Sequence, residues 1–478
     1  MNTENNSTKK VIPITPAESD GDTMAHYEPA KTIYPRSVTG VFTNWRWIMV
    51  WVTQLIFYGL PWVEWGQRQA VLFDLGVRRF YIFGLVLYPQ DFIYLTGMLI
   101  ISALSLFLFT AVAGRLWCGY ACPQTVYTEI FLWIEKKIEG DRTAHMRRDA
   151  GPMTADKLRR KVSKHGLWLL LACWTGFTFV GYFTPIKVLA AEVMALDLGA
   201  WEIFWTIFYS FATYLNAGYM REMVCKHMCP YARFQSAMFD KDTLIVTYDT
   251  ERGEPRGARS KKADLSTLNL GACVDCSLCV QVCPTGIDIR NGLQYECIGC
   301  GACADVCDTV MDKVGYPRGL VKYSTQNAMQ GHWSKEQTVK RVFRPRVLIY
   351  TTVLVGIVLA IAISLAMRTP FKADVVRDRG VMARVVEDGK VENVYSIQVM
   401  NATEATQRYK ISVEGLRGIQ IMSDNMVTLE PTKARWIPLR VQVPAEAEEH
   451  GSHEIHFIIE SLDSPGRLRE ESKFIVPR

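Results

Sequence analysis

The sequence predicts a polytopic α-helical membrane protein with a cysteine-rich insert and a terminal all-β domain. Three observations point to this fold class. Charged residues are missing from several stretches of about 20 residues, the length that crosses about 30 Å of hydrocarbon. Of the 13 cysteines in the 478-residue chain, all but one fall in tight motifs. After residue 367 there is no cysteine, and short apolar runs alternate with turn residues.

The N-terminal segment and the membrane spans follow from the distribution of charge. Residues 1–35 contain Lys9 and Lys10 with no apolar core behind them, so we expect a flexible tail rather than a cleaved secretion signal. Residues 36–240 are expected to hold four spans, and residues 347–367 the last transmembrane helix. The five predicted spans are 46–64, 91–113, 166–186, 200–219 and 347–367.

A shorter apolar run precedes the second predicted span. Residues Tyr81 to Leu87 are too few to cross a bilayer as a helix, and Pro89 follows them. We expect this run to be interfacial or re-entrant, or else to extend the second span.

The loops between the spans differ in positive charge. The loop from Arg115 to Lys164 holds eleven Lys or Arg residues, whereas the loop between the third and fourth spans holds one, Lys187. By the positive-inside rule, the N-terminus, the basic loop and residues 220–346 lie in the cytoplasm. With five spans, the C-terminal domain then lies on the opposite side.

Residues 241–346 contain two cysteine runs of the form CxxCxxCxxxC. The runs are Cys273, Cys276, Cys279 and Cys283, and Cys297, Cys300, Cys303 and Cys307. This is the pattern of bacterial two-cluster ferredoxins, in which the fourth cysteine of each run ligates the cluster of the other run. It predicts a ferredoxin-like domain with two [4Fe-4S] clusters, one held by Cys273, Cys276, Cys279 and Cys307 and the other by Cys283, Cys297, Cys300 and Cys303.

Two other roles for these cysteines fit the spacing poorly. Structural zinc sites normally use two separated pairs of ligands, and disulfides need an oxidising compartment. One departure from the ferredoxin pattern is that Asp308 follows Cys307 where Pro is usual, which is expected to alter the hydrogen bonding of that cluster but not its ligand count.

Four more cysteines form two CxxxCP motifs, each just past the end of a predicted span. The pairs are Cys118 with Cys122 and Cys225 with Cys229. A spacing of i, i+4 places both thiols on one face of a helical turn, so four thiols converge if the second and fourth spans are neighbours. Met223, His227 and Met228 surround the second pair, and thiolate with thioether favours Cu(I). The alternatives are a dithiol that cycles to a disulfide, and packing or surface roles for the two methionines and the histidine.

Residues 368–478 are expected to form a β-sandwich, because runs such as VYSIQV, RYKISV and HEIHFIIE are separated by turns. Cys173, alone in the third span, is expected to be a small buried residue. Neither a Gly-rich dinucleotide fingerprint nor a phosphate-binding loop is found, so electrons must come from an external donor. The net charge of +6 lies beside the spans and needs no nucleic acid to explain it.

The order of these motifs resembles the FixG/RdxA/CcoG family of cytochrome c oxidase accessory proteins. The resemblance covers nearly the whole chain, from the paired CxxxCP motifs through the ferredoxin-like insert and last span to the terminal β domain. It implies a bacterial inner (plasma) membrane protein whose residues 368–478 form a periplasmic immunoglobulin-like domain. The implied activity is that of an oxidoreductase, a cupric reductase that supplies Cu(I) for assembly of the cbb-type haem-copper cytochrome c oxidase.

Applied to this sequence, the resemblance implies copper binding at the CxxxCP motifs. The residues concerned are Cys118, Cys122, Cys225 and Cys229, with His227 and Met228 as auxiliary ligands. The implied partners are an electron donor, copper carriers, the oxidase or its assembly factors, and the lipid bilayer. Two alternatives stay open: a quinol dehydrogenase-type subunit, because a related nitrate-reductase maturation family combines the same motifs, and a non-enzymatic assembly scaffold.

Overall fold

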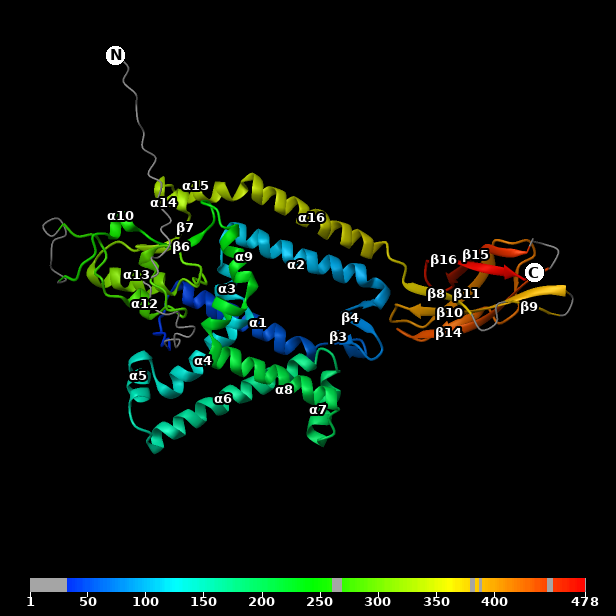
Figure 1. The fold of residues 1–478 in the computed structure, drawn as a ribbon, viewed down its shortest axis with the longest axis horizontal. Coiled ribbons are helices and arrows are strands. Elements are labelled where there is room, and N and C mark those ends of the chain that lie inside the picture. Colours follow the sequence, from blue (N-terminus) through cyan, green and yellow to red (C-terminus); the bar gives the residue numbers. More distant parts are fainter. Residues whose placement is uncertain (1–31, 260–268, 379–382, 387–388, 445–449, 478) are drawn as a thin grey trace, which may run out of the picture.

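Helices fill the middle of an elongated molecule, with the cysteine-rich segment at one end and the C-terminal β-sandwich at the other (Figure 1). The computed structural model describes residues 32–259, 269–378, 383–386, 389–444 and 450–477. Most of the predicted tail, residues 1–31, lies outside the described residues. Its last part is held in place: the Tyr34 hydroxyl donates to Asp149 at 3.0 Å, and the Tyr34 carbonyl accepts from Arg142.

Within the described part of the chain, two helices are both long enough and apolar enough to cross a membrane. They are α2, Phe92–Ala113, which continues a 3-10 turn from Pro89, and α16, Pro345–Ala366. The two pack side by side (Figure 1), since Gly97 leaves room for Ile361, and the hydroxyls of Tyr94 and Ser364 lie 2.9 Å apart. They correspond to the predicted spans 91–113 and 347–367.

The other three predicted spans are also helical but are shorter or more polar. They are α1, Val41–Gly59, α6, Ala155–Val180, and α8, Ala200–Leu215. Helix α1 starts before the predicted position 46 and includes Arg46, which is 5% exposed because it pairs with Glu129. The charged residues of α6 all lie in its first half, and α8 has only 16 residues.

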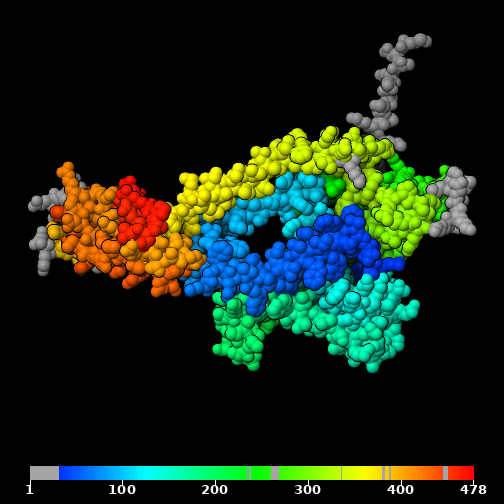
Figure 2. Space-filling view, turned by 180° about the vertical axis from the view of Figure 1, so that it is seen from behind, coloured from blue at the N-terminus to red at the C-terminus, as the bar shows by residue number. Residues whose placement is uncertain are grey.

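Two pairs of these helices pack together, α2 with α16 and α6 with α8. Helices α6 and α8 pack closely at Gly176, where a side chain would meet Ser210. An opening passes between α1 and α2 in the space-filling view (Figure 2). Cys173 is exposed on α6, so its predicted burial was wrong; the neighbouring helices do not cover that face.

Residues 64–88 differ from the prediction: they form short antiparallel strands. The strands are β1, Glu64–Trp65, β2, Arg68–Gln69, β3, Val71–Asp74, β4, Arg79–Ile82, and β5, Leu85–Leu87. The run 81–87 therefore does not extend α2. Its apolar side chains Tyr81 and Val86 pack with Tyr88 against Met400 of the β-sandwich, so a protein surface rather than lipid covers them.

The β-sandwich is tied to this small sheet by polar contacts. Asp91, at the start of α2, is 4% exposed and forms ion pairs with Arg368 at 2.6 Å and with Lys372. The Tyr88 hydroxyl donates to the Asn401 carbonyl at 2.9 Å. These contacts fix the sandwich at the end of α2 and α16.

The sandwich consists of two antiparallel sheets, ordered β12-β14-β10-β8, with β9 on β10, and β13-β11-β15-β16. The strands are β8, Phe371–Arg377, β9, Arg384–Val385, β10, Lys390–Asn401, β11, Gln407–Glu414, β12, Gln420–Ile421, β13, Met426–Leu429, β14, Ala434–Pro444, β15, Gly451–Ser461, and β16, Arg467–Val476. Alternate residues of β14, Leu439, Val441 and Val443, are buried between the sheets, as expected for strands with one covered face.

The described residues of the cysteine-rich segment form a two-stranded sheet, one helix of 13 residues and several shorter ones. The elements are β6, Ile245–Tyr248, α10, Thr250–Gly253, α12, Leu278–Gln281, α13, Ala302–Val314, β7, Val321–Ser324, α14, Gln326–Gln330, and α15, Lys335–Lys340. Asp305 of α13 caps the N-terminus of α1: its carboxylate accepts from the backbone N–H of Phe42 at 3.1 Å and of Thr43 at 2.7 Å. This cap fixes the segment against α1 and stabilises the helix end.

Short helices connect the spans on the side of the cysteine-rich segment. They are α3, Leu116–Tyr120, α4, Pro123–Glu139, α5, Arg142–Ala150, the π-helical turns η3, Asn216–Met220, and η4, Val224–Met228, and α9, Pro230–Met238. Helix α7, Ile186–Ala195, lies at the opposite end of α6 (Figure 1).

Candidate functional site

The first cysteine run lines a cavity together with the last cysteine of the second run. Four thiols face it: Cys273, Cys276, Cys279 and Cys307. The rest of the lining is mostly aliphatic, including Leu278 and Val310. Cys276 is exposed, so this cavity lies close to the surface.

A second cavity is lined by the other four cysteines of the two runs, Cys283, Cys297, Cys300 and Cys303. Cys279 lines both cavities, which makes them direct neighbours. Cys300 is 7% exposed, so this cavity is more deeply enclosed. The structure thus brings together the two sets of four thiols that the crossed pattern groups.

The two runs make the same backbone turns with different residues. Asp275 and Ser277 have positive φ in the first run, at 50° and 53°, and Gly299 and Gly301 at the equivalent positions have φ of 64° and 74°. A Cβ on Gly301 would lie 2.8 Å from Cβ of Phe42 on α1. The second run uses glycine because α1 leaves no space, whereas the first run has room for side chains.

Each CxxxCP motif spans a break between two helices. Cys118 lies on α3 and Cys122 is the N-cap of α4, while Cys225 lies on η4 and Cys229 is the N-cap of α9. In both motifs the proline is the first residue of the following helix, a position where its missing N–H costs no hydrogen bond. The i, i+4 spacing predicted that both thiols of a pair share one regular helical turn. The structure differs, because the second cysteine of each pair lies at the start of the next helix.

The four CxxxCP thiols lie close enough to interact electrostatically. Burial raises the pKa of Cys118 to about 12, and the neighbouring Cys122 and Cys225 add to this. Burial likewise raises the pKa of Cys225 to about 11, with contributions from Cys122 and Cys229. Thiols in this state are protonated at neutral pH, so a metal that binds them as thiolates releases protons.

This group of thiols packs directly on the second cysteine run. Cys118 and Cys225 contact the apolar cluster that contains Ile298 and Cys300. Gly119, inside the first CxxxCP motif, lies so close that a Cβ there would be 2.9 Å from Cα of Cys300. No other residue type fits without moving the two loops apart.

Arg115 and two tyrosines strengthen the same contact. The Arg115 guanidinium donates to the carbonyls of Tyr295, in the second run's loop, and Ala232, on α9. Tyr323 donates to the Gly299 carbonyl at 2.6 Å, and the hydroxyl of Tyr120 lies 3.3 Å from that of Tyr323. In the sequence Arg115 indicates only topology, because its partners lie more than a hundred residues away.

The residues around Cys225 divide into two groups. His227 and Met228 are exposed, whereas Cys225 and Cys229 are half-buried. Glu222, which sequence analysis did not single out, lines a small cavity together with Cys225. The proposed auxiliary ligands therefore lie outside the half-buried group of thiols, and a carboxylate lies beside it.

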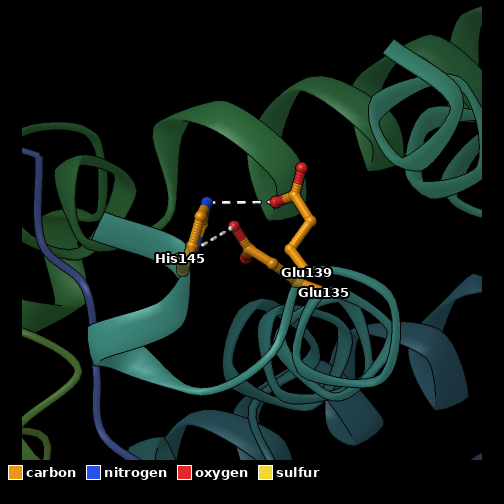
Figure 3. A group of neighbouring side chains, drawn as sticks. All are labelled: Glu135, Glu139 and His145. Atoms are coloured by element: carbon orange, nitrogen blue, oxygen red, sulfur yellow. Dashed lines mark ion pairs between the residues drawn. The ribbon is translucent and has the colours of Figure 1, made fainter. Parts of the chain in front are cut away.

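A separate set of metal-type side chains lies between α4 and α5: Glu135, Glu139 and His145 (Figure 3). Cations already neutralise the carboxylates, since Lys164 lies 2.9 Å from Glu139 and Arg221 lies 2.6 Å from Glu135. Although burial acts in the opposite direction, hydrogen bonds from His145 and Lys164 lower the pKa of Glu139 to about 2. This arrangement is a charge network that joins the helices.

Comparisons with known proteins agree with the location of these cysteines. Sequence profiles match a 4Fe-4S binding domain at residues 95–140, a 4Fe-4S dicluster domain at 220–326 and the IG-like fold at the C-terminus of FixG at 361–477. The nitrogen fixation protein FixG of Rhizobium meliloti is 38% identical over 467 residues, covering 88% of this chain and 89% of FixG. Protein RdxB of Cereibacter sphaeroides is 39% identical over 402 residues, covering 82% of this chain and 84% of RdxB. RdxA of the same organism is 38% identical over 404 residues, with the same coverage.

Proposed function

The chain belongs to the FixG/RdxA family, and from this we propose that it is a membrane oxidoreductase that reduces Cu(II) to Cu(I) for assembly of the cbb-type haem-copper cytochrome c oxidase. Its redox character rests on the matches to 4Fe-4S domains. The proposed reduction of copper rests on the CxxxCP cysteines, which lie beside the cysteine runs. The external electron donor would be a soluble protein that reaches the exposed Cys276.

The cysteines of the two runs fit a pair of iron–sulfur clusters, because each cavity is lined by at least four thiols, with Cys279 shared between them, and is otherwise mostly apolar. We assign Cys273, Cys276, Cys279 and Cys307 to one cluster and Cys283, Cys297, Cys300 and Cys303 to the other. Bound clusters of this type supply one-electron transfer.

One observation carries the proposal: the CxxxCP thiols lie directly against the second cysteine run. The close approach at Gly119 and the bridge through Arg115 hold the two loops together. The order along the molecule is then an exposed cysteine cavity, an enclosed one, and a group of thiols beside the membrane helices. Such an order suits electron entry at one end and a metal substrate at the other.

The copper substrate would be held by Cys118, Cys122, Cys225 and Cys229. Among the described residues, no three of these thiols offer sulfurs that all lie within 4.8 Å of one another. Two thiolates are enough for Cu(I), which accepts low coordination numbers, and sulfur ligands stabilise Cu(I) over Cu(II). His227 and Met228 are exposed beside Cys229, so we propose that they receive Cu(I) on its way out.

For the membrane topology we propose all five predicted spans, with α1, α6 and α8 crossing beside α2 and α16. The positive charge of the loop Arg115–Lys164 then lies in the cytoplasm with the N-terminus and the cysteine-rich segment. The β-sandwich, at the other end of α2 and α16 (Figure 1), lies in the periplasm. There it would meet the oxidase, its assembly factors or copper carriers.

One observation favours a second candidate, a quinol dehydrogenase-type subunit. A cavity of about 710 Å³ lies at the end of α6 and α8, lined by aromatic side chains including Phe183, Trp201 and Trp205. A quinol ring would fit there. No cysteine lines this cavity, so copper reduction remains the first proposal.

The test is an anaerobic titration of the dithionite-reduced, full-length protein with Cu(II), in which absorbance and Cu(I) are followed together. The key variant replaces Cys118, Cys122, Cys225 and Cys229 with Ala. Its matched control is Cys173→Ala, which removes a cysteine outside every motif.

The proposal requires stoichiometric Cu(I) formation in the wild type and the control, and its loss in the quadruple variant, with iron content unchanged in all three. Equal Cu(I) formation in the quadruple variant, or none in the wild type, would overturn it. Reoxidation by a quinone instead of Cu(II) would favour the second candidate.

A further inference from the structure

A cavity of about 140 Å³ lies between residues 34–38, α1, α4 and α5. Five Lys or Arg residues line it: Arg36, Arg46, Lys136, Arg142 and Arg221. Three acidic residues line it: Glu129, Glu135 and Asp141. The lining therefore has a surplus of two positive charges before His145 is counted.

The surplus is concentrated at the mouth of the cavity. Deep in the cavity the charges are paired, Arg46 with Glu129 and Arg221 with Glu135. Arg36 and Lys136 are exposed and make no ion pair among the described residues. A solute that enters from water therefore meets positive charge first, which attracts anions and repels free cations.

This cavity adjoins the one that contains Cys225. The two share part of their lining, including Arg46, Glu129 and Arg221. The adjoining cavity is smaller, about 30 Å³ against about 140 Å³, and is also lined by Glu222.

We propose that the basic cavity lined by Arg36 and Lys136 binds copper as an anionic Cu(II) chelate and that the copper is passed from there to the adjoining cavity. This inference rests on the proposed function. In the adjoining cavity the Glu222 carboxylate suits Cu(II) and the Cys225 thiol suits Cu(I). In the reduction, Cu(II) gains one electron from the dithionite-reduced protein, a Cu–S bond forms, the Cu–chelator bonds break, and the thiol proton leaves with the chelator.

Binding is tested first on the full-length protein without dithionite. The probes are Cu(II)–nitrilotriacetate, an anion, and Cu(II)–triethylenetetramine, a cation, with equilibrium dialysis at low ionic strength. The variant is Lys136→Glu and its matched control is Lys137→Glu, the adjacent exposed lysine that does not line the cavity. Ratios between proteins are taken within each chelate, so the different copper affinities of the chelators cancel.

Lys136→Glu should weaken binding of the anionic chelate about three- to tenfold and strengthen binding of the cationic one, with both effects reduced by salt. Lys137→Glu should change the binding of either chelate by less than about twofold. Arg36→Glu, on the other side of the mouth, should repeat the Lys136→Glu pattern. The inference is overturned if the two lysine variants behave alike, or if both chelates respond in the same direction.

Cu(I) formation by the reduced protein separates this inference from the proposed function. If wild type reduces copper from both chelates and Lys136→Glu slows neither, copper reduction stands and the anionic route is wrong. If wild type reduces copper from neither chelate, the proposed function is wrong, and the inference about its substrate falls with it.

Discussion

The two cysteine runs have the same spacing and the same backbone turns, yet they lie in different surroundings. The first leaves Cys276 exposed and places Asp275 and Ser277 at the positions of positive φ. The second is enclosed by α1 and the CxxxCP loops and has glycine at both positions. Ligand spacing alone therefore does not distinguish the two sites. Packing around each run gives the molecule an outward-facing and an inward-facing site.

The largest effect on iron content is expected when Gly301 of the second run is replaced by serine, the residue at the equivalent position of the first run. Gly301→Ser would place a Cβ 2.8 Å from Phe42, although serine tolerates the same backbone angle at position 277. We expect the free energy of unfolding to fall by about 1–3 kcal/mol and about half of the iron to be lost. Iron and acid-labile sulfide per protein measure this.

The matched control is Ser277→Gly in the first run, which should retain its iron. If Gly301→Ser also kept its full iron content, contact with α1 would not explain why glycine occupies this position. The two cysteine runs would then differ in sequence but not in the space that their surroundings leave.

A smaller effect is expected in resistance to iron removal. The first site should lose iron to a chelator under mild oxidation about tenfold faster than the second, because the protein shell controls solvent access to a metal site. Time-resolved EPR would follow both sites, with Cys276→Ala and Cys300→Ala used to assign the signals. Equal rates, or faster loss from the second site, would contradict the difference in enclosure.

The smallest effect concerns the reduction potential of the second site. Arg46 and Glu129 lie close enough to Cys300 to shift the pKa of its thiol in opposite directions. A positive charge favours the reduced, more negative form, so Arg46→Gln should lower the second potential and Glu129→Gln should raise it, each on the order of tens of millivolts. EPR-monitored redox titration measures both sites, and the first should serve as an unchanged internal control.

Local features of the sequence predicted the cysteine groups, the two most apolar helices and the terminal sandwich. Each depends on spacing or periodicity within a short window, as in the two CxxCxxCxxxC runs. The family resemblance was also confirmed by relatives that are similar over most of the chain. The ligand assignments, the copper site and the topology remain predictions.

Contacts between distant residues explain what the sequence did not reveal. The run 81–87 was expected at the membrane because its apolar side chains do not indicate whether lipid or Met400 covers them. Helix α1 begins at Val41, before the predicted start at residue 46, and the charge of Arg46 within it is neutralised by Glu129. The bridge made by Arg115 joins segments that no periodicity relates.

The cap on α1 can form only after most of the chain has been translated. The Asp305 carboxylate that accepts from Thr43 lies 262 residues further along the chain. At about 5–20 residues per second, roughly 13–50 s of translation separate the helix from its cap. During that interval the first helix leaves the ribosome with its N-terminal amide groups unprotected, and it is completed only when α13 has folded around its cysteines. Supply of iron and sulfide would thus limit completion of α1, so iron-starved cells should accumulate chains that a protease cuts near residue 40.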